Sequence, residues 1–242
     1  MSSSPPRPAD AGPRQRRKEA RPHELLEAAL ALFVEKGFAA TRTEEVARRA
    51  GVSKGTLYLY YPSKEELFKA VVRHNLSSLI AEGEALAGQF EGSSSELLAK
   101  LMLTWWQRAG NTPAAGIHKI VLSEVRNFPE LAQFYTDEVM VPADRLFSGT
   151  VQRGIERGEF RPMPTHEVAL MLIAPLIFMA VHRHSFGACP VHGGVDVDAS
   201  LMLQTHLDLV LRGLEVRADP AAAAPPTLRE ALPATPREKA AK

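Results

Sequence analysis

Several signatures of common protein classes are absent from this 242-residue sequence. It contains one cysteine, Cys189, which excludes a disulfide within the chain, and its first residues hold no apolar run of the kind that forms a secretory signal. The most apolar stretch, Leu170–Val181, is about a dozen residues long and falls short of the ~20 that span a bilayer, which favours a buried helix. We therefore expect a cytoplasmic protein with no membrane partner.

Catalytic signatures are missing as well. No glycine-rich phosphate loop, no Ser/His/Asp order and no paired-carboxylate motif stands out. The sequence therefore shows no catalytic constellation, and we expect neither enzymatic activity nor a cofactor. A pocket with convergent titratable groups would contradict this expectation.

The charge is nearly balanced overall but unevenly divided. The net charge is +1, and the 45% hydrophobic content is sufficient for a globular core. Residues 1–69 carry 13 Lys and Arg against 9 Asp and Glu, whereas residues 70–242 carry 16 against 19. The basic excess thus falls in the part of the chain that holds the motif described next.

The stretch Thr43–Lys64 has the pattern of two short helices joined by a tight turn. Thr43 can cap the first helix, Gly51 supplies the backbone freedom that ends it, and Ser53 can cap the second. Pro62 ends the second helix. Two helices around a glycine-containing turn form a helix-turn-helix.

The second of these helices has two different faces. At ~100° per residue Leu57 and Tyr61 fall together, whereas Gly55 and Leu59 fall on the opposite side. Leu59 is a poor residue to expose to solvent but can contact a thymine methyl in the major groove, and Gly55 permits close approach of the backbone. The free side also offers an ammonium, a hydroxyl and two phenols to phosphates and base edges, from Lys54, Thr56, Tyr58 and Tyr60. Helix geometry alone leaves open an ordinary surface helical hairpin.

A resemblance to the DNA-binding domain of TetR-family transcriptional regulators runs without gaps through Leu25–Ala70. It is carried above all by Gly51-Val-Ser-Lys-Gly-Thr-Leu-Tyr58, followed by Tyr60-Tyr-Pro-Ser-Lys-Glu-Glu-Leu67. The resemblance implies an all-α fold with an N-terminal three-helix helix-turn-helix domain and a larger C-terminal helical bundle. It also implies a homodimer that binds operator DNA and whose C-terminal domain binds a small effector.

The family pattern and the face analysis together predict the DNA contacts. Leu59 departs from the polar or aromatic residue that the family often has at its position. Phosphate contacts are expected from Thr43, Tyr58, Tyr60 and Lys64, base-edge contacts from Lys54, Gly55 and Leu59, and Ser53 and Thr56 complete the predicted interface.

Four segments are predicted along the chain. They are a disordered basic tail (1–20), the DNA-binding domain (21–70), a ligand-binding and dimerisation domain (71–218) and a second disordered tail (219–242). The basic cluster Arg14–Lys18 can reach phosphates or the minor groove, or it can simply keep the protein soluble. The domain boundary is placed near Ala70, inside a helix that begins at Lys64 and runs past the small core. In the family this fourth helix links effector binding to the separation of the two recognition helices.

Helix breaks at glycine and proline divide the remaining chain. The first helix is expected from near Pro22 to Gly37, and Pro142 is expected to kink a later one. By order, the last two long helices match those that form the family's dimer interface, a four-helix bundle. The C-terminal helices are predicted at Ser95–Ala109, Pro113–Arg126, Pro129–Gly158, Thr165–Ser185 and Asp196–Arg217.

The C-terminal domain has an aromatic and thioether inventory suited to an adaptable apolar pocket. Trp105 and Trp106 point about 100° apart on one helix, so only one of them can occupy the centre of a given face. The effector is expected between the helix that carries them and those that carry Phe147 and Phe178, although plain helical core is the alternative for each residue. The predicted ligand-binding residues are Met102, Trp105, Trp106, Phe128, Phe134, Phe147, Phe178 and Met179.

Two polar groups have a weaker signal. Nitrogen and sulfur ligands for Zn²⁺ or Cu occur within eleven residues, but their spacing is not a recognised zinc pattern, so no metal site is predicted. These residues are His182, His184, Cys189 and His192. His118, Glu124 and Arg126 can supply a polar contact to an effector, although we expect them at the surface.

The sequence therefore predicts a ligand-responsive DNA-binding transcriptional regulator. We expect a repressor that binds a pseudo-palindromic operator as a dimer and is released by a small apolar or aromatic effector. The alternative is a constitutive or architectural DNA-binding protein whose C-terminal domain only dimerises, and a C-terminal core without a pocket would favour it.

Overall fold

The computed structural model describes residues 13–124, 126–185, 187 and 198–216 of the chain. These residues are helical apart from turns and one isolated bridge between Phe160 and Glu215, in agreement with the predicted all-α fold. The elements in order are α1 (Pro13–Lys36), α2 (Thr43–Arg49), α3 (Lys54–Tyr60), α4 (Lys64–Val72), the π-helical η1 (Arg73–Ser77), α5 (Ser78–Gln89), α6 (Ser94–Trp105), the π-helical η2 (Trp106–Gly110), the 3₁₀ turn η3 (Pro113–Ala115), α7 (Gly116–Glu124), α8 (Pro129–Tyr135), the π-helical η4 (Thr136–Met140), α9 (Val141–Glu156), α10 (Thr165–Arg183) and α11 (Ala199–Leu214).

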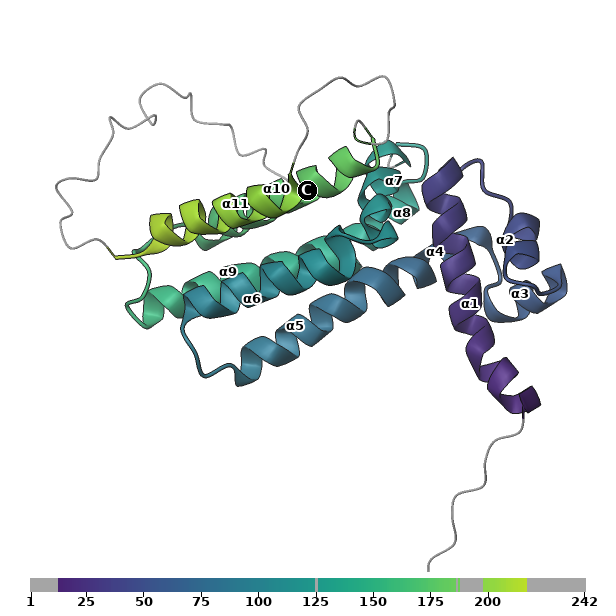
Figure 1. Ribbon diagram of the computed structural model, residues 1–242, viewed down its shortest axis with the longest axis horizontal. Coiled ribbons are helices and arrows are strands. Elements are labelled where there is room, and N and C mark those ends of the chain that lie inside the picture. The colour runs from purple at the N-terminus through teal and green to yellow at the C-terminus, as the bar shows by residue number, and fades with distance from the viewer. Residues whose placement is uncertain (1–12, 125, 186, 188–197, 217–242) are drawn as a thin grey trace, which may run out of the picture.

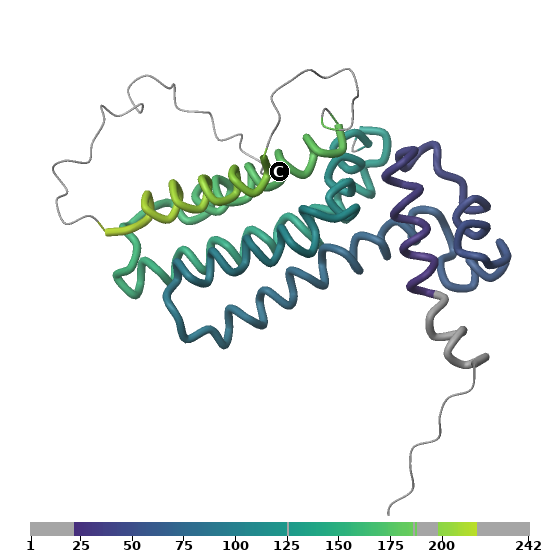
Figure 2. Tube along the Cα trace, viewed as in Figure 1, coloured from purple at the N-terminus to yellow at the C-terminus, as the bar shows by residue number. Residues whose placement is uncertain are grey.

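The helices form two groups that a third connects. Figure 1 shows α1, α2 and α3 together at one end and the long helices α5, α6, α9, α10 and α11 side by side at the other. The short helices α7 and α8 lie between the two groups. The chain passes from one group to the other along α4, η1 and α5, which follow one another without a break in the trace of Figure 2.

The helix α1 differs from its prediction at its start. It begins at Pro13 instead of near Pro22, so Pro22 lies inside the helix. The end was predicted correctly, because Gly37 has φ +82, a left-handed value that favours glycine. The buried stripe of α1 consists of Leu25, Ala28, Ala29, Leu32 and Phe33.

The C-terminal helices begin and end within a few residues of their predicted bounds. Ser93 and Glu96 form a capping box that starts α6 at Ser94, one residue before the predicted start. The irregularity expected at Pro142 takes the form of the π-helical η4, which ends two residues before that proline. The same segment carries Glu138, whose carboxylate accepts hydrogen bonds from Nε and Nη2 of Arg73 in η1, at 3.1 and 2.7 Å.

Two hydrophobic cores hold the helices together. The first core joins α1–α4 to α7 and α8, and the second lies between α6, α9, α10 and α11. Trp105 and Ile80 pack against both. The first core therefore extends well beyond residues 21–70, while the domain boundary near Ala70 stays a prediction.

The helix α10 is buried along one stripe only. It has 19 residues and a mean hydropathy of 1.6, and among the described helices it alone is long and apolar enough to cross a membrane. Only 33% of its most apolar 18-residue stretch is buried inside the protein. The expected burial of Leu170–Val181 is thus found along one stripe, which includes Leu172, Leu176 and Met179, while the opposite face of α10 is exposed in the single chain.

Candidate DNA interface and effector site

A tight turn sets the placement of α3 against α2. Gly51 has φ +68, and the amide of Val52 donates to the carbonyl of Ala47 at 2.9 Å. The hydroxyl of Ser53 accepts a hydrogen bond from the amide of Thr56 at 3.1 Å and caps α3, as the sequence predicts. The two helices and this turn form the expected helix-turn-helix.

The helix α3 has one face in the first core and the other in solvent. Leu57 is fully buried and Tyr61 is half-buried, and burial raises the pKa of Tyr61. On the opposite side Leu59 is 85% exposed, and the flanking Tyr58 and Tyr60 are each 38% exposed. The predicted division into two faces is confirmed, and α3 presents an apolar side chain between two phenols.

Thr43 does not take the position that the sequence predicts for it. It is buried at 6% exposure, and its hydroxyl oxygen lies 2.9 Å from that of Tyr58. It does not cap α2 either, because Arg42 occupies the capping position and its side chain makes no cap. Thr43 therefore holds the ring of Tyr58 in place, and its hydroxyl does not face solvent.

Lys64 is also engaged inside the protein. Its ammonium donates to the carbonyls of Phe38 and Ala39 at 2.9 and 3.0 Å, and it lies 4.6 Å from the centre of the Phe38 ring. A group expected to contact phosphate thus fastens the connection between α1 and α2. Lys64 therefore holds the loop that precedes the helix-turn-helix.

Lys54 remains at the surface of α3. Its ammonium pairs with the carboxylate of Glu44 at 2.5 Å, which lowers the pKa of Glu44 and raises that of Lys54. Both side chains are about half exposed, so this ion pair is weak and Lys54 is free to exchange Glu44 for a phosphate or a base edge. The position of Gly55 is open, since an added Cβ would meet only Ser53 Oγ at 3.8 Å.

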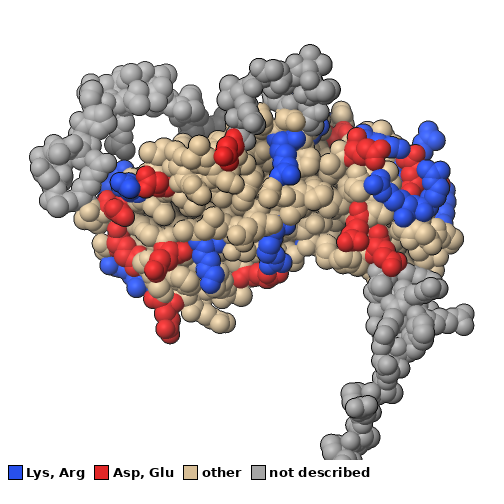
Figure 3. Space-filling view, viewed as in Figure 1, with Lys and Arg blue, Asp and Glu red and all other residues tan. Residues whose placement is uncertain are grey.

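Basic side chains gather around the helix-turn-helix. Figure 3 shows Lys and Arg, with acidic residues between them, at the end of the molecule where Figure 1 places α2 and α3. The exposed basic residues of these two helices and their flanks are Arg42, Arg48, Arg49 and Lys54. The side chains of the Arg14–Lys18 cluster lie outside the described part of the structure.

The residues predicted to bind the effector are divided between the two cores. Phe128 and Phe134 belong to the first, and Trp105 packs against both. Phe178, one residue from the buried Met179, points away from the second core and is 54% exposed. The second core holds Met102, Trp106, Phe147 and Met179.

The two predicted effector residues in the first core, Phe128 and Phe134, connect the DNA-binding helices to α8. The rings of Phe128 and Phe38 meet edge to face at 4.8 Å between their centres. The ring of Phe134 lies 4.9 Å from the guanidinium of Arg73 and 5.7 Å from the ammonium of Lys69. These contacts place both rings at the junction of the two groups of helices.

His118, expected at the surface, is buried at 4% exposure. Its Nδ1 lies 2.5 Å from the phenol oxygen of Tyr135, and the ring of Trp105 is 5.7 Å away between centres. Burial, with a smaller contribution from the charge of His184, lowers the pKa of His118 to about 4. Burial also raises the pKa of Tyr135, so both groups are neutral near pH 7.

Glu124 makes a contact that spacing along the sequence gives no means to predict. Its carboxylate accepts a hydrogen bond from the amide of Ala39 at 3.4 Å, across 85 residues of sequence. The end of α7 therefore touches the loop that Lys64 holds from the other side. Of the three polar residues considered together, Arg126 is the exposed one.

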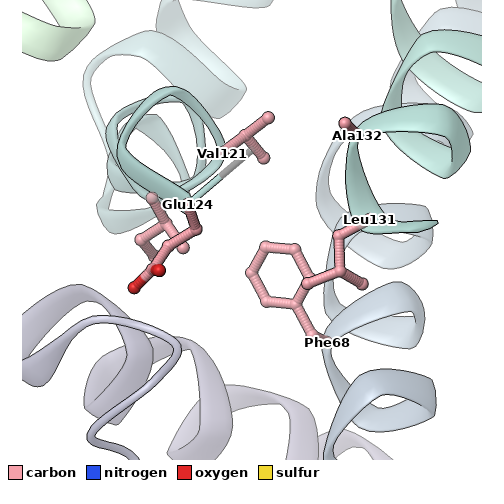
Figure 4. Close-up of a pocket in the computed structure, with 6 residues that line it drawn as sticks. Phe68, Val121, Glu124, Leu131 and Ala132 are labelled. Atoms are coloured by element: carbon pink, nitrogen blue, oxygen red, sulfur yellow. The ribbon is translucent and has the colours of Figure 1, made fainter. Parts of the chain in front are cut away.

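A small cavity lies between α4, α7 and α8 (Figure 4). Its volume is about 10 Å³, which is enough for one water molecule at most. The ring of Phe68 and the side chain of Leu131 border it on one side and Val121 on another. The cavity is too small for an effector.

Metal ligands do not converge in the part of the chain that the structure describes. No group of three or more His, Cys, Asp or Glu side chains there is arranged to hold a metal ion. Of the four residues considered for such a site, His182 and His184 are described, while Cys189 and His192 lie outside the described residues.

Comparisons with known proteins agree with this architecture. Residues 25–71 match the family model described as bacterial regulatory proteins, tetR family. The chain is 28% identical over 198 residues to the HTH-type transcriptional repressor KstR2 of Rhodococcus jostii (strain RHA1), covering 81% of this chain and 92% of that protein. It is 30% identical over 152 residues to the uncharacterized HTH-type transcriptional regulator YfiR of Bacillus subtilis (strain 168), covering 60% of this chain and 71% of that protein.

A solved structure shares the fold. The ketosteroid transcriptional regulator KstR2 of Mycobacterium tuberculosis superimposes with a TM-score of 0.61 at 25% identity, covering 81% of this chain and 96% of that one. These relatives are described as transcriptional regulators. Together with the helix-turn-helix and its exposed α3, the matches show that the chain belongs to the tetR family of bacterial regulatory proteins and is a DNA-binding transcriptional regulator.

Proposed function

We propose that this regulator is a repressor that binds a pseudo-palindromic operator as a homodimer and leaves it when a small apolar or aromatic effector binds. The observation that carries the proposal is the position of α7. It packs in the first core against α1 and also contacts α10 of the bundle. A ligand that displaces α7 from the bundle side therefore acts on the helix-turn-helix.

The exposed face of α3 supports sequence-specific binding. Leu59 is the most exposed of the large hydrophobic side chains in the described residues, and the major groove offers it thymine methyl groups. The phenols of Tyr58 and Tyr60 flank it at the distance of one residue and are suited to the phosphates. The interface we propose consists of Ser53, Lys54, Gly55, Thr56, Tyr58, Leu59 and Tyr60.

Leu59→Ala tests this assignment. It should change the free-energy preference among the bases at one operator position by roughly 1 kcal/mol or more. Tyr60→Phe should instead weaken binding to all sequences alike. Base-preference profiles are measured on randomised duplexes, with Leu122→Ala, a 62% exposed leucine of α7, as the matched control. A profile that Leu59→Ala leaves unchanged would remove Leu59 from the readout.

An outward apolar face on α10 and α11 supports the dimer. Uncovered apolar surface of this kind marks an interface, and a twofold axis through it creates a four-helix bundle. Such a bundle lets two α3 helices reach successive major grooves, about 34–36 Å apart. The face comprises Leu170, Met171, Phe178, Leu201 and Leu209, which are 47–68% exposed.

The dimer is tested by placing a charge in this face. Phe178→Lys should give a monomer in sedimentation experiments and reduce operator affinity, because each half-site is then bound alone. Leu122→Lys, at a similarly exposed position on α7, should leave the dimer intact. A Phe178→Lys protein that remains dimeric places the interface elsewhere.

The path from effector to DNA runs through both ends of α7. At its start an added Cβ on Gly116 would lie 2.7 Å from Val34 of α1, so the two helices are in close contact. At its end Glu124 bonds to the amide of Ala39. Because α7 contacts α1 and the loop before α2 at these two points, we expect its displacement to change the placement of α3.

The coupling has a reciprocal consequence. An effector that weakens operator binding 5- to 150-fold has a coupling free energy of ~1–3 kcal/mol, and operator DNA must weaken effector binding by the same factor. The apolar effector class is supported by the M. tuberculosis relative, which is described as a ketosteroid regulator. Effector affinity is measured with and without saturating operator duplex, and equal values would favour a constitutive DNA-binding protein instead.

A further inference from the structure

We propose that His118 is the hydrogen-bond anchor of the effector site, and that the effector carries an acceptor oxygen, such as a ketone, on an apolar body. This inference rests on the proposed function and specifies the chemistry of its ligand. The observation behind it is a buried imidazole that has only one of its two nitrogens hydrogen-bonded.

The unpaired atom is Nε2 of His118. The side chain is 4% exposed, and no partner for Nε2 exists among the described residues, although Nδ1 pairs with Tyr135. A buried polar atom without a partner loses its hydrogen bonds to water and gains none in exchange. In a native protein such an atom binds a ligand or a water molecule, or else it lowers the stability of the fold.

The hydrogen bond at Nδ1 determines what Nε2 requires. If Tyr135 donates its phenol hydrogen to Nδ1, one bond satisfies the phenol and Nδ1, and the proton of the neutral imidazole sits on Nε2. In the reverse arrangement the phenol hydrogen would need an acceptor of its own, and the described residues show none. Nε2 is therefore an N–H donor, and its partner must be an acceptor.

The rings nearest to His118 are aromatic and offer an apolar surface to a ligand. The ring of Trp105 lies 5.7 Å away, and Trp105 is half-buried where the first and second cores meet. His118 stands on α7, which packs against α1, α8, α10 and η3. The titratable neighbours on these elements are Tyr135, bonded to Nδ1, and His184, whose charge would lower the pKa of His118. No carboxylate of the described residues pairs with the imidazole.

This chemistry selects the kind of effector. An apolar molecule with a carbonyl group satisfies Nε2–H and lays its body against the indole ring. A hydrocarbon of the same shape leaves the donor unpaired, so the site discriminates between the two. An ammonium or another pure donor is rejected because it offers no lone pair.

A ligand bound at His118 can also change the structure of the DNA-binding end. Glu124 follows His118 by six residues, about 9 Å along the same short helix. A ligand that pulls on the imidazole shifts α7 as a unit, and α7 ends on the amide of Ala39 beside the Lys64 contacts. The polar anchor and the DNA-binding loop thus share one rigid element.

Matched pairs of probes test the proposal on the full-length protein. Benzophenone is compared with diphenylmethane, and cyclohexyl phenyl ketone with benzylcyclohexane, because each pair differs only by a carbonyl in place of a methylene. Titration calorimetry on the wild type should give about tenfold or tighter binding of the ketone in at least one pair. Equal affinities, or no ketone binding at all, would overturn the proposal and leave Nε2 to a buried water.

The variants separate anchoring from folding. His118→Phe alone strands the phenol of Tyr135, so the informative variant is His118→Phe with Tyr135→Phe, which removes both polar groups together. It should unfold in a normal cooperative transition, bind operator as the wild type does and bind ketone and hydrocarbon within about twofold of each other. A ketone preference that persists in it places the anchor elsewhere.

A control variant and a DNA measurement complete the design. Thr150→Val removes another buried hydroxyl, which donates to the carbonyl of Leu146 at 2.8 Å in α9, and should keep the ketone preference. Operator binding is measured on the same samples. Wild-type protein that binds operator but shows no ketone preference overturns the anchor alone, whereas protein that binds no operator overturns the proposed function.

Discussion

The two cores of this protein differ in how completely one chain closes them. The first core surrounds the rings of Phe33, Phe38 and Phe68, which meet at 5.3–5.7 Å between centres and are at most 1% exposed. The second core is covered on the side of α6 and α9, but α10 and α11 leave Phe178 and Leu209 in solvent. The first core is thus complete within one chain, while the second leaves apolar surface exposed, which the proposed dimer would cover.

The first core also teaches where the DNA-binding unit ends physically. The family model matches residues 25–71, yet the rings packed on Phe38 include Phe128, far outside that range. The helix-turn-helix therefore shares its interior with α7 and α8. Residues of α7 and α8 and Leu57 of α3 thus belong to one continuous core.

The largest effect should come from breaking the first core at Phe38. Phe38→Ala removes a fully buried ring between α1, α4 and the turn before α8, and should lower the free energy of unfolding by about 3–5 kcal/mol. The measurement is urea denaturation at pH 7.5. Phe178→Ala is the matched control at an exposed position, and a similar loss there would show that the second core is as closed as the first.

A pH titration of stability probes the border between the cores. His118 has a pKa of about 4 in the folded protein and about 6.5 when unfolded, so it is neutral in both states above pH 6.5. Below pH 6.5 the unfolded chain binds a proton that the folded protein does not, and the free energy of unfolding falls with pH. The loss is about 2 kcal/mol at pH 5 and about 3 kcal/mol near pH 4.

The comparison is made between the wild type and the double variant His118→Phe with Tyr135→Phe. Denaturation curves are recorded from pH 7.5 to pH 4.5, so that the remaining carboxylates and histidines contribute alike to both proteins. The free energy of unfolding of the wild type, minus that of the double variant, should decline as the pH falls through 6.5. A constant difference would mean that His118 takes up its proton in the folded state.

Glycine substitutions give a smaller effect whose sign differs between the two regions. Gly116→Ala places a Cβ 2.7 Å from Val34, and this clash of about 1–3 kcal/mol outweighs the gain of at most ~1 kcal/mol in helix propensity. Gly149→Ala in α9 meets nothing within 4 Å and should stabilise the protein by up to ~1 kcal/mol. Melting temperatures that shift in the same direction would refute the close contact of α7 with α1.

What the sequence predicted and what it missed follow from the range of the interactions. The two faces of α3 depend on helix geometry alone, so the exposure of Leu59 was predictable. The bounds of the C-terminal helices follow from local glycine and proline breaks. The burial of His118 and the bond between Glu124 and Ala39 depend on how α7 packs against α1. No spacing along the chain encodes that contact.

The inward position of Thr43 is the subtlest of these long-range effects, and its substitution should have the smallest consequence. If its hydroxyl only holds Tyr58, Thr43→Val should weaken operator binding by about 1 kcal/mol in the wild type and by nothing in a Tyr58→Phe background. In a Tyr60→Phe background, where an equally exposed phenol is lost, the full effect should remain. Operator affinities of all six proteins are measured by fluorescence anisotropy at one salt concentration. A loss that persists in the Tyr58→Phe background would return Thr43 to the direct phosphate contact that the sequence predicts.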